Sequence, residues 1–236
     1  MRMRKKPNLH PRMERCEAVW VRDPQAMQGR WRERMPEAKE LHVEVGCGKG
    51  KFTVELAKAR PDILLVAIEK VPDALVVAME LALREGVRNV LFLSEDAENL
   101  CDIFGYGEVD RIYLNFCDPW PRKKNAKRRL TYHTFLRRYA WILRDGGQID
   151  FKTDNEKLFA FSLEEFAASG YRLDHVTDDL HANGPQGIMT GYEEKFYELG
   201  TPIHRCEAVV LERPAEADVP PKPGIPPEAA PEPEAE

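Results

Sequence analysis

Strand-like and helix-like segments alternate through most of this chain. Residues 63–68 are a continuous apolar run, which is typical of a strand buried on both faces of a sheet. Other segments rich in strand-forming residues resemble it. Together they predict strands at 41–45, 63–68, 90–93, 109–116, 148–152, 171–176 and 203–211.

Between these strands, apolar residues recur at helical spacing, as Phe52, Leu56 and Ala59 do. Glycines such as Gly86 and Gly170 follow the helical segments, as expected at helix C-termini. The pattern predicts helices at 51–60, 72–85, 97–104, 131–143 and 155–169, with a turn at 145–147. Repeated strand–helix units predict an α/β fold: a doubly wound, mostly parallel sheet with helices on both faces.

The two ends of the chain differ from this middle. Residues 1–38 are basic and interrupted by prolines, so we expect an N-terminal arm outside the sheet, with partial helix at 27–35. Residues 212–236 are acidic and rich in proline, and we expect them to be disordered. Residues 39–211 would then form the folded domain. The tail accounts for the formal net charge of −5, so basic segments can still attract an anionic partner.

Composition excludes several classes of protein. No apolar run is long enough for a membrane span, and no apolar segment follows the basic N-terminus as in a signal peptide, so we expect a cytoplasmic protein. The 5 cysteines lack the C-x-x-C spacing of zinc sites, and the histidines show no ligand spacing. We therefore predict neither a disulfide framework nor a metal. The oligomeric state, monomer or homodimer, stays open.

A ligand of a doubly wound sheet binds at the carboxyl ends of its strands. The loop after the first strand contains Gly46, Gly48 and Gly50. Its spacing matches neither a P-loop nor a dinucleotide fingerprint. Glu44 directly before the loop favours a cationic ligand without phosphate, and S-adenosylmethionine has both properties.

Two more acids follow the next strands. Glu69 ends the second strand, where an acid commonly accepts hydrogen bonds from ribose hydroxyls. Asp96 follows the third strand, where it can accept from the exocyclic amine of adenine. The glycine loop and these acids together predict an S-adenosylmethionine site.

The fourth strand leads into a second motif. Residues 114–121 read Leu-Asn-Phe-Cys-Asp-Pro-Trp-Pro, and a dense basic run follows at 122–129. This order places the carboxylate of Asp118, the aromatic surface of Trp120 and several cations within one loop. Enzymes that modify a base within a nucleic acid need such a combination. Methyltransferases acting on adenine amines carry a related Asp/Asn-Pro-Pro-aromatic turn, which leaves an exocyclic amine open as the target.

With four separated motifs, the chain resembles the bacterial tRNA (guanine-N7-)-methyltransferase family. The motifs are residues 114–121, 127–131 (Lys-Arg-Arg-Leu-Thr), 151–155 (Phe-Lys-Thr-Asp-Asn) and 190–196, which begins Thr-Gly-Tyr-Glu. The likeness runs from Met1 to about Leu211. It implies a class I methyltransferase that uses S-adenosylmethionine to methylate guanine N7 in the variable loop of tRNA.

The resemblance also implies roles for individual residues. Glu44, Glu69, Asp96 and the catalytic Asp118 would line the cofactor pocket. The target nucleoside would contact Arg122, Asp154, Thr190, Gly191, Tyr192 and Glu193. Lys124, Asn125, Ala126, Lys127, Arg128 and Arg129 would hold the RNA. The chain departs from the family pattern at Arg122, where lysine is usual, and at Cys117, where serine or threonine is common.

The chemistry of guanine agrees with this assignment. N7 has a free lone pair, so no proton must leave before methylation, and catalysis can rest on positioning and electrostatics. Carboxylates such as Asp118, Asp154 and Glu193 are pure acceptors that match the N1–H and N2–H edge of guanine. Trp120 and Tyr192 are candidates for stacking on bases.

Three alternatives stay open at this point. The first two are an exocyclic base amine and a small molecule as the acceptor, although a small molecule needs no basic segments. The third is a protein of another class, which binds RNA on a methyltransferase scaffold without catalysis and would not need the acids and glycines. His181 lies between two motifs and is a further candidate for the pocket wall.

Overall fold

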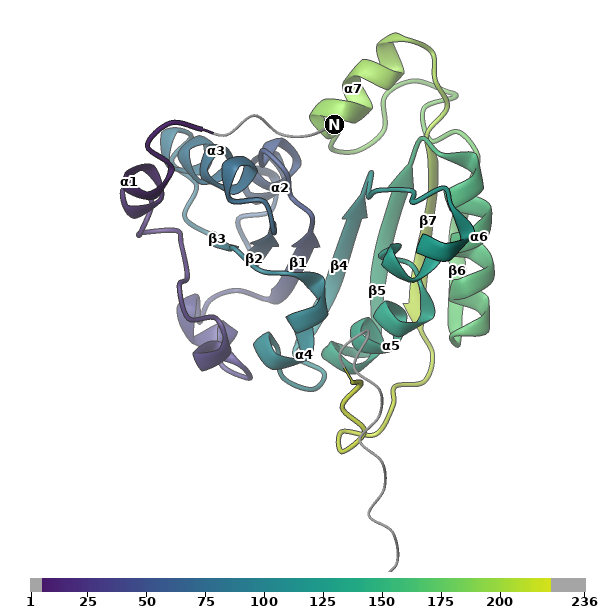
Figure 1. The fold of residues 1–236 in the computed structure, drawn as a ribbon, viewed down its shortest axis with the longest axis horizontal. Helices are drawn as coiled ribbons and strands as arrows, with labels where there is room; N and C mark the ends of the chain where they lie inside the picture. Colours follow the sequence, from purple (N-terminus) through teal and green to yellow (C-terminus); the bar gives the residue numbers. More distant parts are fainter. Residues whose placement is uncertain (1–5, 222–236) are drawn as a thin grey trace, which may run out of the picture.

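The computed structural model describes residues 6–221, which form one twisted sheet with helices on both faces (Figure 1). The sheet has 7 strands in the order β3-β2-β1-β4-β5-β7-β6. The strands are β1 (Glu40–Val45), β2 (Ile63–Ile68), β3 (Val90–Leu93), β4 (Val109–Asn115), β5 (Leu143–Thr153), β6 (Tyr171–Thr177) and β7 (His204–Val210). β7 runs antiparallel to both neighbours, and the other pairs are parallel. The predicted α/β fold is confirmed.

The helices of the domain follow the predicted positions closely. They are α2 (Lys51–Ala59), α3 (Pro72–Arg84), α4 (Leu100–Ile103), α5 (His133–Ile142) and α6 (Glu156–Ala168). The helix expected at 97–104 is divided into a 3-10 turn, Ala97–Asn99, and α4. The Asp96 side chain caps the start of the turn by accepting from the Glu98 N–H. The turn expected at 145–147 lies within β5 as a bulge, where Gly146 has a φ of +68°.

Strand β2 shows why the sheet needs two layers of helices. All of its residues are buried, and they alternate between two apolar clusters. Leu64 and Val66 face the cluster that contains α4, α5 and α6, whereas Leu65 and Ala67 face the cluster of α2 and α3. The sheet is therefore covered on both faces, and its carboxyl edge is left open for a ligand.

The N-terminal segment is more closely integrated than we expected. It contains the short helix α1 (Leu9–Glu14) and two 3-10 turns, Gln25–Met27 and Trp31–Arg34. Trp20 forms a bridge with Phe92 on the edge strand β3, which the segment thereby covers. Trp31 is fully buried and donates from Nε1 to the carbonyl of Ile103 at 2.8 Å. We expected an arm outside the sheet and did not predict these contacts of Trp20 and Trp31 with the domain.

The first residues of the acidic tail also pack on the domain. Trp141 donates from Nε1 to the carbonyl of Glu216 at 3.1 Å, and Arg213 pairs with Asp145 at 2.7 Å. We expected residues 213–221 to be disordered, but they pack on the domain. Residues elsewhere in the chain bind their backbone and side chains. The remaining tail, 222–236, and the first five residues lie outside the described part. No helix within residues 6–221 is long and apolar enough to cross a membrane.

Helix α7 (Gly191–Glu198), like α1, was not expected. This helix lies over the carboxyl edge of the sheet, above β4 and β5 (Figure 1). It begins with a capping box, in which Thr190 accepts from the Glu193 N–H and Glu193 accepts from the Thr190 N–H. The Thr-x-x-Glu spacing is the signal in the sequence from which this helix could have been predicted.

Candidate active site

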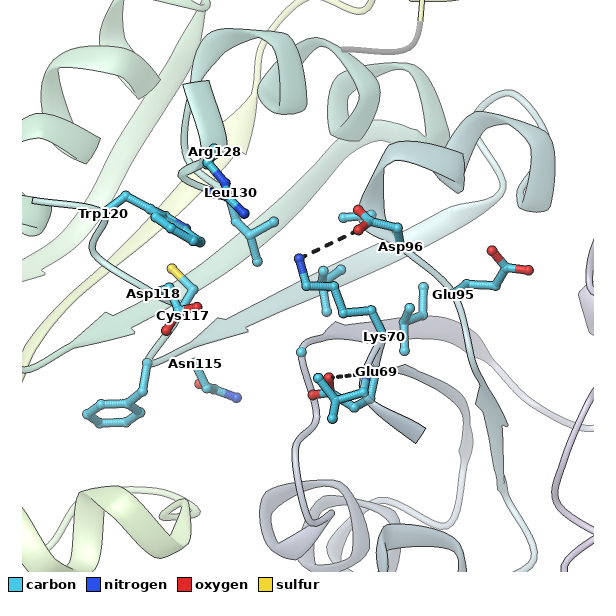
Figure 2. A pocket seen from close by; sticks show the side chains of 16 residues that line it. Glu69, Lys70, Glu95, Asp96, Asn115, Cys117, Asp118, Trp120, Arg128 and Leu130 are labelled. Atoms are coloured by element: carbon cyan, nitrogen blue, oxygen red, sulfur yellow. Dashed lines mark hydrogen bonds and ion pairs between the residues drawn. The ribbon is translucent and has the colours of Figure 1, made fainter. Parts of the chain in front are cut away.

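A pocket opens at the carboxyl ends of β1, β2, β3 and β4 (Figure 2). The structure brings together there many of the residues singled out in the sequence. The lining includes Gly46, Glu69, Asp96, Asn115, Asp118 and Trp120. The pocket therefore lies at the edge of the sheet where a ligand is expected to bind.

The glycine loop meets the pocket at Gly46, whereas Gly48 and Gly50 do not line it. Gly46, Gly48 and Gly50 all have positive φ angles, of +86°, +57° and +79°, so the loop follows a path that favours glycine. The N–H of Gly48 donates to Glu69 Oε2 at 3.0 Å. This bond fixes the loop against the end of β2.

Glu69 and Asp96 lie in the pocket wall with part of their acceptor capacity used. Glu69 also accepts from the Val71 N–H at 2.9 Å, so backbone donors hold both of its oxygens in place. Asp96 caps its 3-10 turn with one oxygen, and its other oxygen lies 3.6 Å from Lys70 Nζ (Figure 2). Lys70 was not anticipated in the sequence as a pocket residue.

Glu44 does not line the pocket, contrary to the expectation that it faces the ligand. Its side chain is buried behind the loop, where Oε2 accepts from the Thr53 hydroxyl at 2.5 Å. Asn115 donates to Oε1 at 3.4 Å. Burial raises the pKa of Glu44 to about 7, and the two hydrogen bonds oppose this effect.

This raised pKa predicts a dependence of stability on pH. Folded Glu44 keeps its proton up to about pH 7, whereas an unfolded glutamate loses it near pH 4.3. The free energy of unfolding should therefore fall by up to about 3 kcal/mol as the pH rises through this window. Glu44→Gln should remove that loss, which urea unfolding at about pH 5 and about pH 8 measures. An equal pH dependence in both proteins would show that Glu44 is ionised in the fold.

The turn after β4 is held in an unusual backbone conformation. Phe116 and Trp120 have φ angles of +52° and +39°, which non-glycine residues rarely adopt and which cluster at functional sites. Arg129 donates to the carbonyls of Pro119 and Trp120, each at 3.1 Å. The guanidinium of Arg128 stacks 3.7 Å above the Trp120 ring. The Asp118 carboxylate is exposed at the centre of this turn.

The basic run thus divides into two parts. Arg128 and Arg129 contact the turn itself, which differs from the expectation that the whole run faces RNA. Residues 123–128 form a 3-10 helix that leaves Lys124 and Lys127 exposed. Desolvation raises the pKa of the Cys117 thiol to about 12, which disfavours its nucleophilic thiolate form.

The residues expected to contact the target nucleoside lie at different depths. Arg122, Asp154 and Tyr192 are exposed and lie outside the pocket lining. Asn155, and not Asp154, caps α6, so the side chain of Asp154 is not needed for helix capping. Thr190 caps α7, and Gly191 is its first residue, where an added Cβ atom would lie 3.7 Å from Lys51 Cδ.

Glu193 is fully buried, unlike the exposed Arg122, Asp154 and Tyr192. Lys152 donates to its Oε2 at 2.6 Å, and His181 Nε2 lies 3.0 Å from its Oε1. Desolvation lowers the pKa of Lys152, which the charge of Glu193 opposes. The carboxylate therefore belongs to an internal network and offers no exposed acceptor to a nucleoside. His181, the further candidate for the pocket wall, lies in that network instead.

Among residues 6–221, no group of acids, histidines and cysteines is arranged to hold a metal.

The fold is that of solved RNA methyltransferases. The crystal structure of the 16S rRNA methyltransferase KamB superposes with a TM-score of 0.59 at 15% identity, covering 77% of this chain and 93% of that one. A variant of the 16S rRNA (adenine(1408)-N(1))-methyltransferase from Catenulisporales acidiphilia, solved with its cosubstrate SAM, gives a TM-score of 0.58 at 15% identity. That comparison covers 83% of this chain and 95% of the other. The sheet order and this likeness define the class by its fold, which is that of class I methyltransferases.

Sequence comparisons identify the family within that class. The family described as "Putative methyltransferase" matches residues 38–206. The tRNA (guanine-N(7)-)-methyltransferase of Geobacillus kaustophilus is 45% identical over 210 residues, which cover 89% of this chain and 97% of that protein. The chain belongs to the tRNA (guanine-N(7)-)-methyltransferase family, and the resemblance seen in the four motifs is confirmed.

Proposed function

We propose that this protein transfers the methyl group of S-adenosylmethionine to N7 of a guanine in tRNA. The observation that carries the proposal is the turn at Asp118, which presents an exposed carboxylate between the cofactor pocket and the basic run. The family relationship supplies the substrate, and the resemblance assigns the guanine to the variable loop. A tRNA substrate is consistent with action in the cytoplasm.

The pocket suits a ligand that carries many hydrogen-bond donors. Glu69 and Asp96 provide carboxylate oxygens, and Asn115 Oδ1 is a buried acceptor without a partner among the described residues. The ribose hydroxyls and adenine amine of S-adenosylmethionine are donors of the kind that such acceptors bind. We assign the ribose to Glu69 and the adenine amine to Asp96. The sulfonium of the bound cofactor supplies an electrophilic methyl group.

The residues of the chain would orient the acceptor base and stabilise its charge. Guanine gains positive charge as N7 is methylated, and a carboxylate at its N1–H and N2–H edge becomes more favourable as this charge grows. We assign that role to Asp118, and we assign the exposed Asp154 and Arg122 to contacts with the nucleoside. Tyr192 is exposed on α7 and provides a surface on which a base can stack.

Transfer of labelled methyl to unmodified tRNA tests the proposal. Digestion to nucleosides and mass spectrometry should give 7-methylguanosine. A transcript that contains 7-deazaguanosine, which lacks the N7 atom, is the matched control and should accept no label. Label in methyladenosine would contradict the guanine assignment. Absence of both label and calorimetric cofactor binding would favour an RNA-binding protein without catalysis.

The exposed lysines of the basic run should control the electrostatic part of tRNA affinity. Replacing Lys124 and Lys127 with alanine should reduce the slope of log affinity against log salt by about 0.7 to 0.9 for each phosphate that the variant no longer neutralises. Lys157→Ala, an equally exposed charge on α6, is the control and should leave the slope unchanged. An unchanged slope in the double variant would show that these lysines contact only solvent.

A further inference from the structure

Three ionisable side chains meet in the interior beneath α7. Lys152 comes from β5, His181 from the segment after β6, and Glu193 from α7 itself. All three are buried, and none of them lines the cofactor pocket. Burying such groups costs desolvation energy, and the arrangement persists only if its hydrogen bonds are well satisfied.

The hydrogen bonds of this network are satisfied within the protein. Glu193 accepts from Lys152, from His181 and from the Thr190 N–H at 3.1 Å. His181 Nδ1 accepts from the Gln186 N–H at 3.1 Å, so Nε2 carries a proton and donates to Glu193. Lys152 also donates to the carbonyl of Ile188 at 3.0 Å. The network therefore ties α7 and the segment that precedes it to β5.

The same lysine connects the network to the turn that carries Asp118. The carbonyl of Lys152 accepts from the Phe116 N–H at 2.9 Å, directly where the turn begins. The Phe116 ring stacks on Phe196 of α7, with ring centroids 6.1 Å apart. Helix α7 and the turn are thus held at a fixed separation through Lys152 on one side and through two aromatic rings on the other.

We propose that Lys152, Glu193 and His181 are positioning residues that hold α7 beside the Asp118 turn. The exposed face of α7 then receives the acceptor nucleoside. Glu193 then acts through the position of α7. This inference rests on the proposed function, since it assigns α7 to the tRNA side of the site. Loss of the network should therefore weaken acceptor binding and leave cofactor binding unchanged, because none of its three residues lines the cofactor pocket.

Glu193→Gln tests the proposal, because glutamine keeps the size of the side chain but leaves Lys152 without its counter-ion. The expected result is a fall of about 100-fold in kcat/KM for tRNA, the effect of displacing a substrate-positioning element, with the Kd for S-adenosylmethionine changed less than about threefold. Hydrogen exchange of the α7 amides, measured without tRNA, should quicken about tenfold or more. Glu198→Gln makes the same substitution at an exposed position of the same helix and should change none of these quantities.

A second pair of variants keeps the test decisive if Glu193→Gln fails to fold. His181→Leu removes the donor to Glu193 without leaving a net charge, and it should reproduce the loss in kcat/KM and the faster exchange. His181→Gln retains an amide N–H donor and should restore both. If α7 exchanges at the wild-type rate in Glu193→Gln or His181→Leu, the proposal is overturned whatever the substrate. If exchange quickens but wild-type protein methylates no tRNA, the proposed function fails and the network still holds α7.

Discussion

Asp118→Ala is expected to lower the rate of methyl transfer by about 10² to 10³-fold, the usual effect of removing one group that stabilises developing charge. The carboxylate is exposed in the turn and lies beside the cofactor pocket, so its loss removes the acceptor for the guanine edge. The affinity for tRNA should change little, because contacts of basic side chains with the phosphates of the RNA supply most of that affinity. Single-turnover kinetics and filter binding measure the two quantities separately.

A substrate variant makes this prediction sharper. Inosine lacks the N2 amine of guanine but keeps N7, so a tRNA with inosine at the target position should be a poorer substrate for wild-type protein. The same change should cost the Asp118→Ala variant much less, because the acceptor of the missing N–H is already gone. Equal losses in both proteins would show that Asp118 does not contact the N2 edge. A loss of tRNA affinity in Asp118→Ala would indicate a structural role for the turn.

The sequence was informative wherever local chemistry determines the structure. The apolar run at 63–68 became a strand buried on both faces, and the glycines after β1 adopted positive φ angles. Glu69 and Asp96 could be placed in the pocket because the carboxyl ends of parallel strands meet at one edge. These features depend on periodicity and backbone conformation, which a single sequence reveals.

Other roles depend on partners that lie far away along the chain. Glu193 resembles a surface acid in the sequence, and only the fold brings Lys152 and His181 against it. Arg129 belongs to a basic run that suggests RNA contact, yet it donates to two carbonyls of the turn. A charged residue can bind solvent, a ligand or a buried partner, and composition does not distinguish these environments.

Glu44 shows a third kind of departure. The acid directly before the glycine loop was expected to face a cationic ligand, but its oxygens accept from Thr53 and Asn115 behind the loop. Residues alternate between the two faces of a strand, and the last residues of a strand can point either into the pocket or into the helix layer. Here Thr53 of α2 donates to Glu44 of β1 and holds it on the helix side, a contact that the spacing of the motif does not reveal.

The glycine loop leads to the second large effect that we expect, in the variant Gly50→Ala. A Cβ atom at this position would lie 2.6 Å from Ala78 Cβ and 2.8 Å from Ala78 Cα, and φ is +79°. Because Ala78 is part of α3 and has no flexible side chain to move, α2 and α3 must separate. Overpacking costs about 1 to 3 kcal/mol and the left-handed backbone adds about 1 kcal/mol or more, so the free energy of unfolding should fall by about 2 to 4 kcal/mol.

Gly48→Ala is a matched control for this prediction. Gly48 also has a positive φ, of +57°, but a Cβ atom there has no neighbour within 4 Å in the described part of the chain. Its replacement should cost only the backbone strain of about 1 kcal/mol, and urea unfolding of the two variants measures the difference. An equal loss in both would mean that strain in the loop dominates. A larger loss in Gly50→Ala would show that position 50 requires glycine because α2 and α3 approach each other closely there. Binding of a ligand would then not be the only reason for the glycines of this loop.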